Sequence, residues 1–130
     1  MQDLLERGIR LFNAREFFEC HEVWEEAWTP QRGPRRWFLQ ALIHLAVGFH
    51  HHRQGNPAGA ERQLRKGLKK LAAYLPVHEG LDTAALYHDS ALCLDCIQQH
   101  LPPPELPAIS FSAQTQWRAM DCRSDQPPSA

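Results

Sequence analysis

Apolar residues recur at three- and four-residue intervals through most of the chain, which is the spacing of helices with one buried face. The pattern predicts a first helix over residues 2–12 and a second that runs to Trp28. Between them, Asn13-Ala14-Arg15-Glu16 has the pattern of a capping box, in which the Asn13 side chain would cap the second helix. No stretch alternates in the way that a half-buried strand requires. The sequence therefore predicts an all-α fold.

Proline and glycine residues mark the boundaries of three further helices. The third is predicted over residues 34–53, since a proline suits its first position and a glycine just beyond its end suits a left-handed cap. The fourth begins after Asn56 and carries an apolar stripe as far as Leu75. Asp82 is the predicted cap of the fifth, which runs to about His100 and stops before three prolines. The expected architecture is a compact single-domain bundle of about five helices.

The bundle is expected to occupy residues 1–104, followed by an irregular C-terminal segment over residues 105–130. Residues 105–120 are predicted to pack as an extended strap, whereas the last eight residues have the composition of a disordered tail. The apolar side chains expected to hold the strap are Leu106, Ile109, Phe111 and Trp117.

Composition changes this picture mainly by exclusion. The chain has 14 basic and 15 acidic residues, which argues against a disordered polyelectrolyte and against a globally basic nucleic-acid-binding protein. Its longest nearly apolar run, residues 37–49, is too short to span a membrane, and acids stand at the N-terminus where a secretory signal carries bases. We therefore expect a cytoplasmic protein without a membrane span.

Charge is divided unevenly along the chain. Residues 1–28 hold seven acids and three bases, residues 29–75 hold one acid and nine bases, and residues 76–130 hold seven acids and two bases. We expect the three segments to pack side by side so that their surface charges complement one another. The alternative is that the basic middle segment meets an anionic partner.

The cysteines are interpreted as ordinary core residues. Cys93 and Cys96 lie one turn apart inside a predicted helix, where Cβ atoms are about 5–6 Å apart, and a disulfide needs about 3.5–4.5 Å. A zinc site would need a second closely spaced pair of ligands, which the sequence lacks. The four cysteines are Cys20, Cys93, Cys96 and Cys122.

The second predicted helix combines large aromatic side chains with polar ones. His21 falls on the same helical stripe as Phe17, Trp24 and Trp28, and is therefore expected among aromatic rings that face the core. Glu25 lies one turn further on and can accept a hydrogen bond from the imidazole. That arrangement serves a general base, a metal ligand or a buried structural histidine equally.

The third predicted helix is apolar almost all round, which makes its polar side chains conspicuous. Gln40, His44 and His51 lie within about 40° of one another on the helical wheel and form one polar line. Because an unpaired buried polar group costs about 1–3 kcal/mol, another polar helix edge or a solvent-lined pocket must face this line. The edge formed by His21 and Glu25 is the expected counterpart.

The leading functional hypothesis is a pocket between the second and third helices that binds a small anionic ligand. Arg36, one turn before Gln40, would hold a carboxylate or phosphate group. In a second version, His21, Glu25 and His44 converge on a divalent metal such as zinc and support metal-assisted hydrolysis. The predicted ligand-binding residues are His21, Glu25, Trp28, Arg36, Gln40, His44 and His51.

Two alternatives need no ligand. Gln40, His44 and His51 would then form a structural hydrogen-bond network that keeps two helices in register, or a polar surface where two copies of the chain meet. A non-catalytic helical module that binds a protein or forms a homo-oligomer is therefore also open. A helical-repeat array is not predicted, because no second copy of a repeat unit follows at a fixed spacing.

Several short segments have a combined spacing that is specific, although no single one is. They are Phe18-Glu19-Cys20-His21-Glu22 with Glu25 and Trp28, Arg36 followed by residues 37–46 with Gln40, His51 with Gly55-Asn56 and Gly59-Ala60, and Gly80-Leu81-Asp82. In these segments, over about residues 8–100, the chain resembles the small helical proteins of domain of unknown function family 309.

The resemblance implies a compact all-helical fold and no established activity. It also implies that a histidine, a glutamate, a tryptophan and an arginine gather near the first helix pair. The chain departs from the family pattern at His44, where Gln is usual, and at His50, where Tyr is common. Both departures favour an added capacity for metal binding in this chain.

Overall fold

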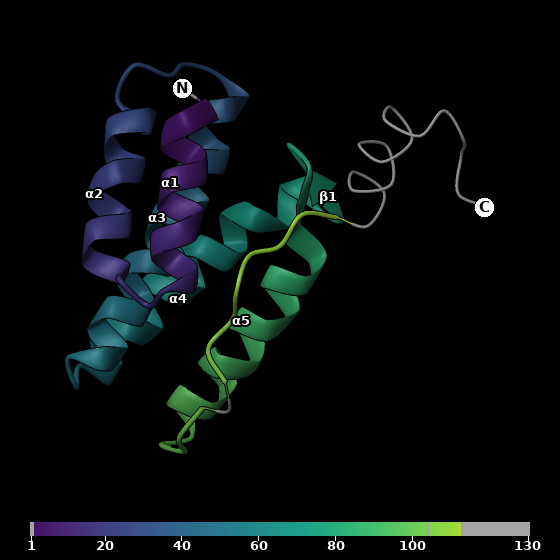
Figure 1. Cartoon of the computed structure of the whole chain (residues 1–130). Coiled ribbons are helices and arrows are strands. Elements are labelled where there is room, and N and C mark those ends of the chain that lie inside the picture. The colour runs from purple at the N-terminus through teal and green to yellow at the C-terminus, as the bar shows by residue number, and fades with distance from the viewer. Residues whose placement is uncertain (1, 104, 113–130) are drawn as a thin grey trace.

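The computed structural model describes residues 2–103 and 105–112, and in this part of the chain five α-helices are joined by short turns and one hairpin (Figure 1). The predicted all-α class is confirmed, and the predicted third helix has the bounds that the structure shows. The helices are α1 (Gln2–Asn13), α2 (Phe17–Trp28), α3 (Pro34–Arg53), α4 (Pro57–Leu71) and α5 (Thr83–Gln98).

Two of the predicted helix caps form as expected. The Asn56 side chain accepts a hydrogen bond from the Gly59 amide at 3.0 Å, and the Asp82 side chain accepts one from the Ala85 amide at 2.9 Å. The apolar stripe of α4 is shorter than predicted. After α4 the chain makes a 3₁₀ turn (Ala72–Tyr74) and then becomes extended, because the residue before a proline disfavours the helical conformation.

Asn13 does not cap α2 as the sequence predicts. Its amide instead forms two hydrogen bonds with Ile109, donating to the carbonyl oxygen at 2.9 Å and accepting from the backbone N–H at 2.7 Å. Arg15 takes a left-handed backbone conformation with φ +68°, and Glu16 precedes α2 without a side-chain capping bond. The capping-box prediction is wrong because a distant segment uses the side chain that the local pattern assigned to the helix.

A hairpin that the sequence did not predict lies before α5. Strands β1 (Val77–His78) and β2 (Leu81–Asp82) pair in an antiparallel manner. Strands of two residues are too short to show the alternation by which strands are recognised. Leu81 also pairs with Phe111, so the hairpin provides an edge for the segment that follows α5.

Residues 105–112 form an extended strap that runs alongside α5 (Figure 1). Arg15 donates from its two terminal nitrogens to the carbonyl oxygens of Pro107 and Leu106, both at 2.7 Å. Together with the two bonds from Asn13, four side-chain hydrogen bonds therefore hold the main chain of the strap. Residues at the junction of α1 and α2 thus fix a segment more than 90 positions away.

The strap also packs through some of its predicted apolar side chains. Ile109 is buried, with 4% of its surface exposed, and Leu106 packs against the core while partly exposed. The Phe111 side chain is exposed, so Phe111 attaches the strap through its backbone pairing with Leu81 and not through a buried side chain. Trp117 and the predicted disordered tail lie outside the described residues.

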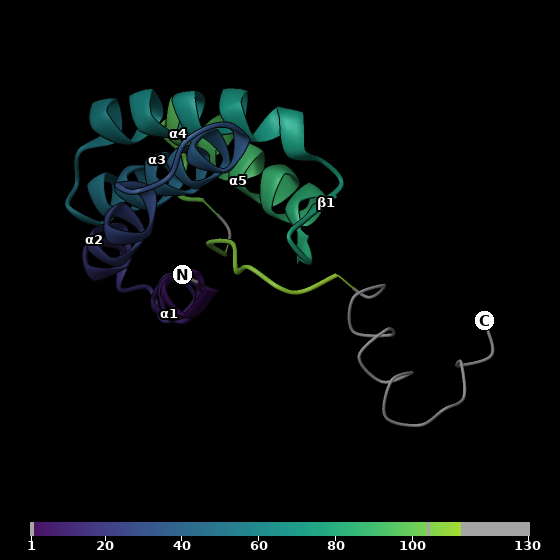
Figure 2. The ribbon, with the colours of Figure 1, turned by 90° about the horizontal axis from the view of Figure 1, so that it is seen from above.

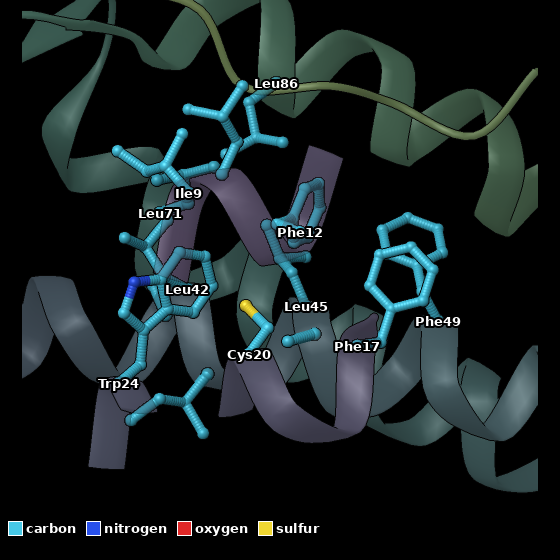
Figure 3. Packing of buried hydrophobic residues seen from close by; sticks show 14 of the residues in the cluster. Ile9, Phe12, Phe17, Cys20, Trp24, Leu42, Leu45, Phe49, Leu71 and Leu86 are labelled. Atoms are coloured by element: carbon cyan, nitrogen blue, oxygen red, sulfur yellow. The ribbon is translucent and has the colours of Figure 1, made fainter. Parts of the chain in front are cut away.

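α3 is the central helix of the fold. Figure 2 shows α4 on one side of the molecule and α1 on the other, with α3 between them. The aromatic rings of Phe12, Phe17, Trp24 and Phe49 gather where α1, α2 and α3 meet, with centroid separations of 5.2–5.9 Å for the contacting pairs (Figure 3). Although α3 is the longest helix, neither it nor another helix in the described part is long and apolar enough to cross a membrane.

The described cysteines are free thiols, and two of them lie in the core as predicted. Cys20 and Cys93 are buried, while Cys96 is partly exposed. Burial raises the pKa of the Cys20 thiol and raises that of Cys93 to about 11, because the interior disfavours a thiolate. Both thiols are therefore protonated at neutral pH. Cys122 lies outside the described residues.

Candidate functional site

His21 lies at the edge of α2 and not among the core aromatic rings. The buried positions of α2 are spaced so that Cys20 occupies the centre of its inward face and His21 the margin. His21 Nδ1 lies 2.8 Å from the carbonyl oxygen of Phe18 and donates to it, because a carbonyl only accepts. Nε2 lies 3.7 Å from a carboxylate oxygen of Glu25, which is 53% exposed. The structure therefore brings His21 and Glu25 together, as predicted, but beside solvent.

The polar line on α3 is divided between different neighbours. His44 donates from Nδ1 to the side-chain oxygen of Gln63 on α4 at 2.7 Å. The side-chain nitrogen Nδ2 of Asn56 lies 3.3 Å from Nδ1 of His51. These contacts correct the expectation that the line faces α2, because α3 is packed between two helices and His44 turns toward α4. Gln40 is partly exposed and makes no side-chain hydrogen bond with the described residues.

The predicted metal ligands do not gather at one point. His21 is paired with Glu25, whereas His44 is bonded to Gln63 on another helix. Within residues 2–103 and 105–112, no three His, Cys, Asp or Glu side chains are close enough to hold one metal ion. The arrangement of donors therefore gives no support to a zinc site formed by His21, Glu25 and His44.

The pKa of His44 is lowered in the folded protein. Burial is the main cause, the hydrogen bond to Gln63 opposes it, and the positive charges of Lys70 and Lys66 add to the lowering. The folded protein therefore favours the neutral imidazole. Stability from this preference is present above the ordinary histidine pKa of about 6.5 and is lost as the pH falls toward the folded pKa.

We expect His44→Gln to reduce the acid sensitivity of the fold, because Gln cannot take up the proton that the partly buried imidazole resists. The measurement is the urea midpoint of unfolding at pH 7.5 and at pH 5.5, for the natural chain and the variant. The drop between the two pH values should be smaller for the variant. Exposed His88→Gln is the matched control, and equal drops for His44→Gln and the natural chain would contradict the assignment.

Trp28 and Arg36 are a second pair of predicted residues that the structure brings together. The guanidinium carbon of Arg36 lies 3.9 Å from the centroid of the Trp28 ring, a cation–π contact between the end of α2 and the start of α3. The indole N–H of Trp28 is buried and has no hydrogen-bond acceptor among the described residues. Arg36 is thus held in place by an aromatic ring whose own polar group is unsatisfied.

A second arginine converges on the same place. The carbonyl oxygen of Gln31 accepts hydrogen bonds from Arg32 at 2.8 Å and from Arg36 at 3.2 Å. Neither guanidinium forms an ion pair with a carboxylate in the described part of the chain. Arg35 differs, because it forms two hydrogen bonds with Glu79 at 2.9 and 3.0 Å. Trp28, Gln31, Arg32 and Arg36 are named the arginine site below.

Arg32, like Gln31, is not among the binding residues predicted from the sequence, and Arg32 contributes a charged side chain. It stands in the polar turn between two helices, where a single charged residue ordinarily points to solvent. The available clue was the density of positive charge, since three arginines fall within five positions of the turn and the start of α3. Only the path of the turn shows that two of them approach one carbonyl oxygen.

The surface charges of the three segments are less complementary than expected. Arg35 and Glu79 join the middle segment to the last one. The glutamates of α2 form no ion pair with Lys or Arg among the described residues, and Arg62, Lys66 and Lys69 of α4 are exposed. The middle segment therefore presents unneutralised positive charge at the arginine site and along α4.

Comparisons with known proteins agree with the resemblance seen in the sequence. Residues 5–63 match the family model described as "Domain of unknown function (DUF309)". Over 87 residues the chain is 37% identical to "Uncharacterized protein YpuF" of Bacillus subtilis (strain 168); the matched segment covers 65% of this chain and 47% of that protein, so the chain spans about half the length of this relative.

The family match ends well before the predicted limit near residue 100. It contains the whole arginine site and Gln40, but it does not extend to Gly80-Leu81-Asp82 or to the strap. Over residues 5–63, the predicted resemblance to domain of unknown function family 309 is confirmed.

Proposed function

We propose that this protein binds a small anionic ligand at the arginine site, through a carboxylate or phosphate group. The convergence of Arg32 and Arg36 on one carbonyl oxygen is the observation that carries the proposal. Two positive charges held close together repel each other, and an anion between them turns that repulsion into attraction. Guanidinium groups also match carboxylate and phosphate oxygens with two parallel N–H donors.

The stacking of Arg36 on Trp28 supports the same function. A long side chain that is already held in place loses less conformational freedom when a ligand binds. The buried indole N–H of Trp28 has no acceptor among the residues that the structure describes, and an unsatisfied group of this kind costs the folded state about 1–3 kcal/mol. Such an unsatisfied group beside an unpaired cation is typical of a place organised for binding and not for stability.

The proposal uses only part of the predicted residue set. Trp28 and Arg36 belong to it, Arg32 and the carbonyl oxygen of Gln31 are added, and Gln40 lies one turn beyond Arg36 on α3. His44 and His51 are excluded, because their side chains are bonded to Gln63 and Asn56. His21 and Glu25 remain paired with each other at the edge of α2.

Titration with inorganic phosphate tests the proposal. The readout is the indole ¹H–¹⁵N signal of Trp28, assigned with Trp28→Phe and followed in sodium phosphate against sodium chloride of equal ionic strength. We expect phosphate to shift this signal in a saturable way. Arg36→Gln and Arg32→Gln should each weaken binding about tenfold, which is the loss of one charged hydrogen bond.

Arg35→Gln is the matched control, because it removes the same charge from the neighbouring position while leaving the arginine site intact. It should alter the attachment of Glu79 but leave phosphate affinity within about twofold of the natural value, since screened charges contribute little at this range. Equal losses for Arg35→Gln and Arg36→Gln, or the absence of a phosphate-specific shift, would contradict the proposal.

A further inference from the structure

A second contact between a cation and an indole ring lies next to the arginine site. Trp37 is the residue after Arg36, and Lys70 of α4 places its ammonium nitrogen 5.2 Å from the centroid of the Trp37 ring. The Trp37 side chain is 53% exposed. An isolated exposed aromatic residue is ordinary, but these two cation–π contacts involve consecutive residues in the first turn of one helix.

Gln40 stands between the two contacts. At about 100° per residue, Gln40 lies about 40° from Arg36 and about 60° from Trp37 on α3, one turn further along. Its amide makes no hydrogen bond with the described residues, although it carries two donors and an acceptor. The start of α3 therefore presents a cation, a free amide and an exposed indole in a single arc.

Positive charge lies at both ends of this arc, on Arg36 at one end and on Lys70 beside Trp37 at the other. Lys70 forms no ion pair in the described part of the chain, and Lys66 and Lys69 are its exposed neighbours on α4. A ligand whose anionic group lies at Arg36 would therefore meet positive charge on the Trp37 side as well.

We infer that the ligand is a planar aromatic ring that carries a phosphate or carboxylate group, an inference that rests on the proposed function. The anionic group lies at Arg32 and Arg36, and the ring packs on the exposed indole of Trp37. A ring stacked on an aromatic side chain contributes appreciably to affinity whatever its substituents, and a lone inorganic anion would gain nothing from Trp37. Gln40 is placed to bond a polar substituent between the two.

Probes that separate the ring from the anion test this inference. They are adenosine monophosphate, ribose 5-phosphate and adenosine, followed by the indole signals of Trp28 and Trp37 in the full-length chain. We expect adenosine monophosphate to move both signals and to bind about tenfold more tightly than ribose 5-phosphate, which should move only Trp28. Benzoate against acetate repeats the comparison for a carboxylate, so the two pairs show which anionic group is preferred.

Trp37→Leu isolates the role of the indole ring, because Leu keeps apolar bulk at a position where Trp37 is 53% exposed. This variant should bind adenosine monophosphate about tenfold more weakly and ribose 5-phosphate unchanged. Lys70→Ala should weaken binding of adenosine monophosphate more than the control Lys69→Ala does.

The possible failures of the two proposals are distinguishable. Equal affinity of the natural chain for adenosine monophosphate and ribose 5-phosphate, and for benzoate and acetate, would overturn the aromatic ligand while leaving the anion site. A Trp37→Leu variant that loses affinity equally for both phosphates would overturn it as well. If no anion moves the Trp28 signal, the proposed function itself is wrong.

Discussion

Gly8→Ala should lower the free energy of unfolding by about 4 kcal/mol, even though the same change inside an ordinary helix stabilises by roughly 0.5–1 kcal/mol. A Cβ atom at Gly8 would lie 1.9 Å from Nε1 of Trp24 and 2.3 Å from Cδ1. The ring cannot move aside easily, because Trp24 is fully buried and its indole N–H donates to the carbonyl oxygen of Leu5. Either α1 and α2 separate or the indole leaves the core, and either change sacrifices packing worth several kcal/mol.

Urea unfolding followed by circular dichroism measures this effect. Trp24→Phe provides the matched background, since the smaller ring leaves room near Gly8. In a double-mutant cycle, Gly8→Ala should cost at least about 1 kcal/mol less when Phe occupies position 24. A stabilised Gly8→Ala variant, as helix propensity alone would give, would show that the two helices do not cross as closely as described.

Asn13→Ala should release the strap and lower the free energy of unfolding by about 2–3 kcal/mol. The substitution leaves the backbone N–H and carbonyl of buried Ile109 without the partners that Asn13 provides. Hydrogen exchange at two other amides reports on strap docking: Ser112, which donates to Gly80, and Asp82, which donates to Ser110. Their exchange should accelerate by about 30-fold, the equivalent of about 2 kcal/mol.

Asn13→Asp separates the two bonds made by the amide. Aspartate keeps an oxygen that accepts from the Ile109 N–H but has no donor for the Ile109 carbonyl oxygen. Its effect on exchange should therefore fall between those of the natural chain and Asn13→Ala. Unchanged exchange at Ser112 in Asn13→Ala would mean that Arg15 and the hairpin hold the strap without Asn13.

The elements predicted correctly are those whose causes lie within a few residues. Apolar residues at helical spacing identify α1 to α5 in the sequence. Asn56 and Asp82 cap the helices that directly follow them. Asn13 carries the same local signal as these two residues. Its partner is 96 positions away, and no property of the neighbouring residues reveals that a strap will return to compete for the side chain.

For the candidate site, too, the sequence predicted the features within one helix but not the contacts between elements. Helical periodicity places Gln40, His44 and His51 on one line, but it cannot tell which neighbouring helix that line meets, so the bond from His44 to Gln63 was missed. The pairing of Trp28 with Arg36 agrees with their predicted proximity. The role of Arg32 depends on how the turn before α3 directs the carbonyl of Gln31, which periodicity does not describe.

The position of the strap has a consequence for synthesis on the ribosome. α1 is synthesised before the other described elements, but the backbone atoms that Asn13 and Arg15 bind are added more than 90 peptide bonds later. The packing of α1 to α4 involves only residues that precede the strap. A nascent chain can therefore form most of its core while the surface that residues 105–112 later cover is still exposed to solvent. Residues 105–112 can bind to this surface only after α1 to α5 have been synthesised, and a chain terminated before residue 105 would leave it uncovered.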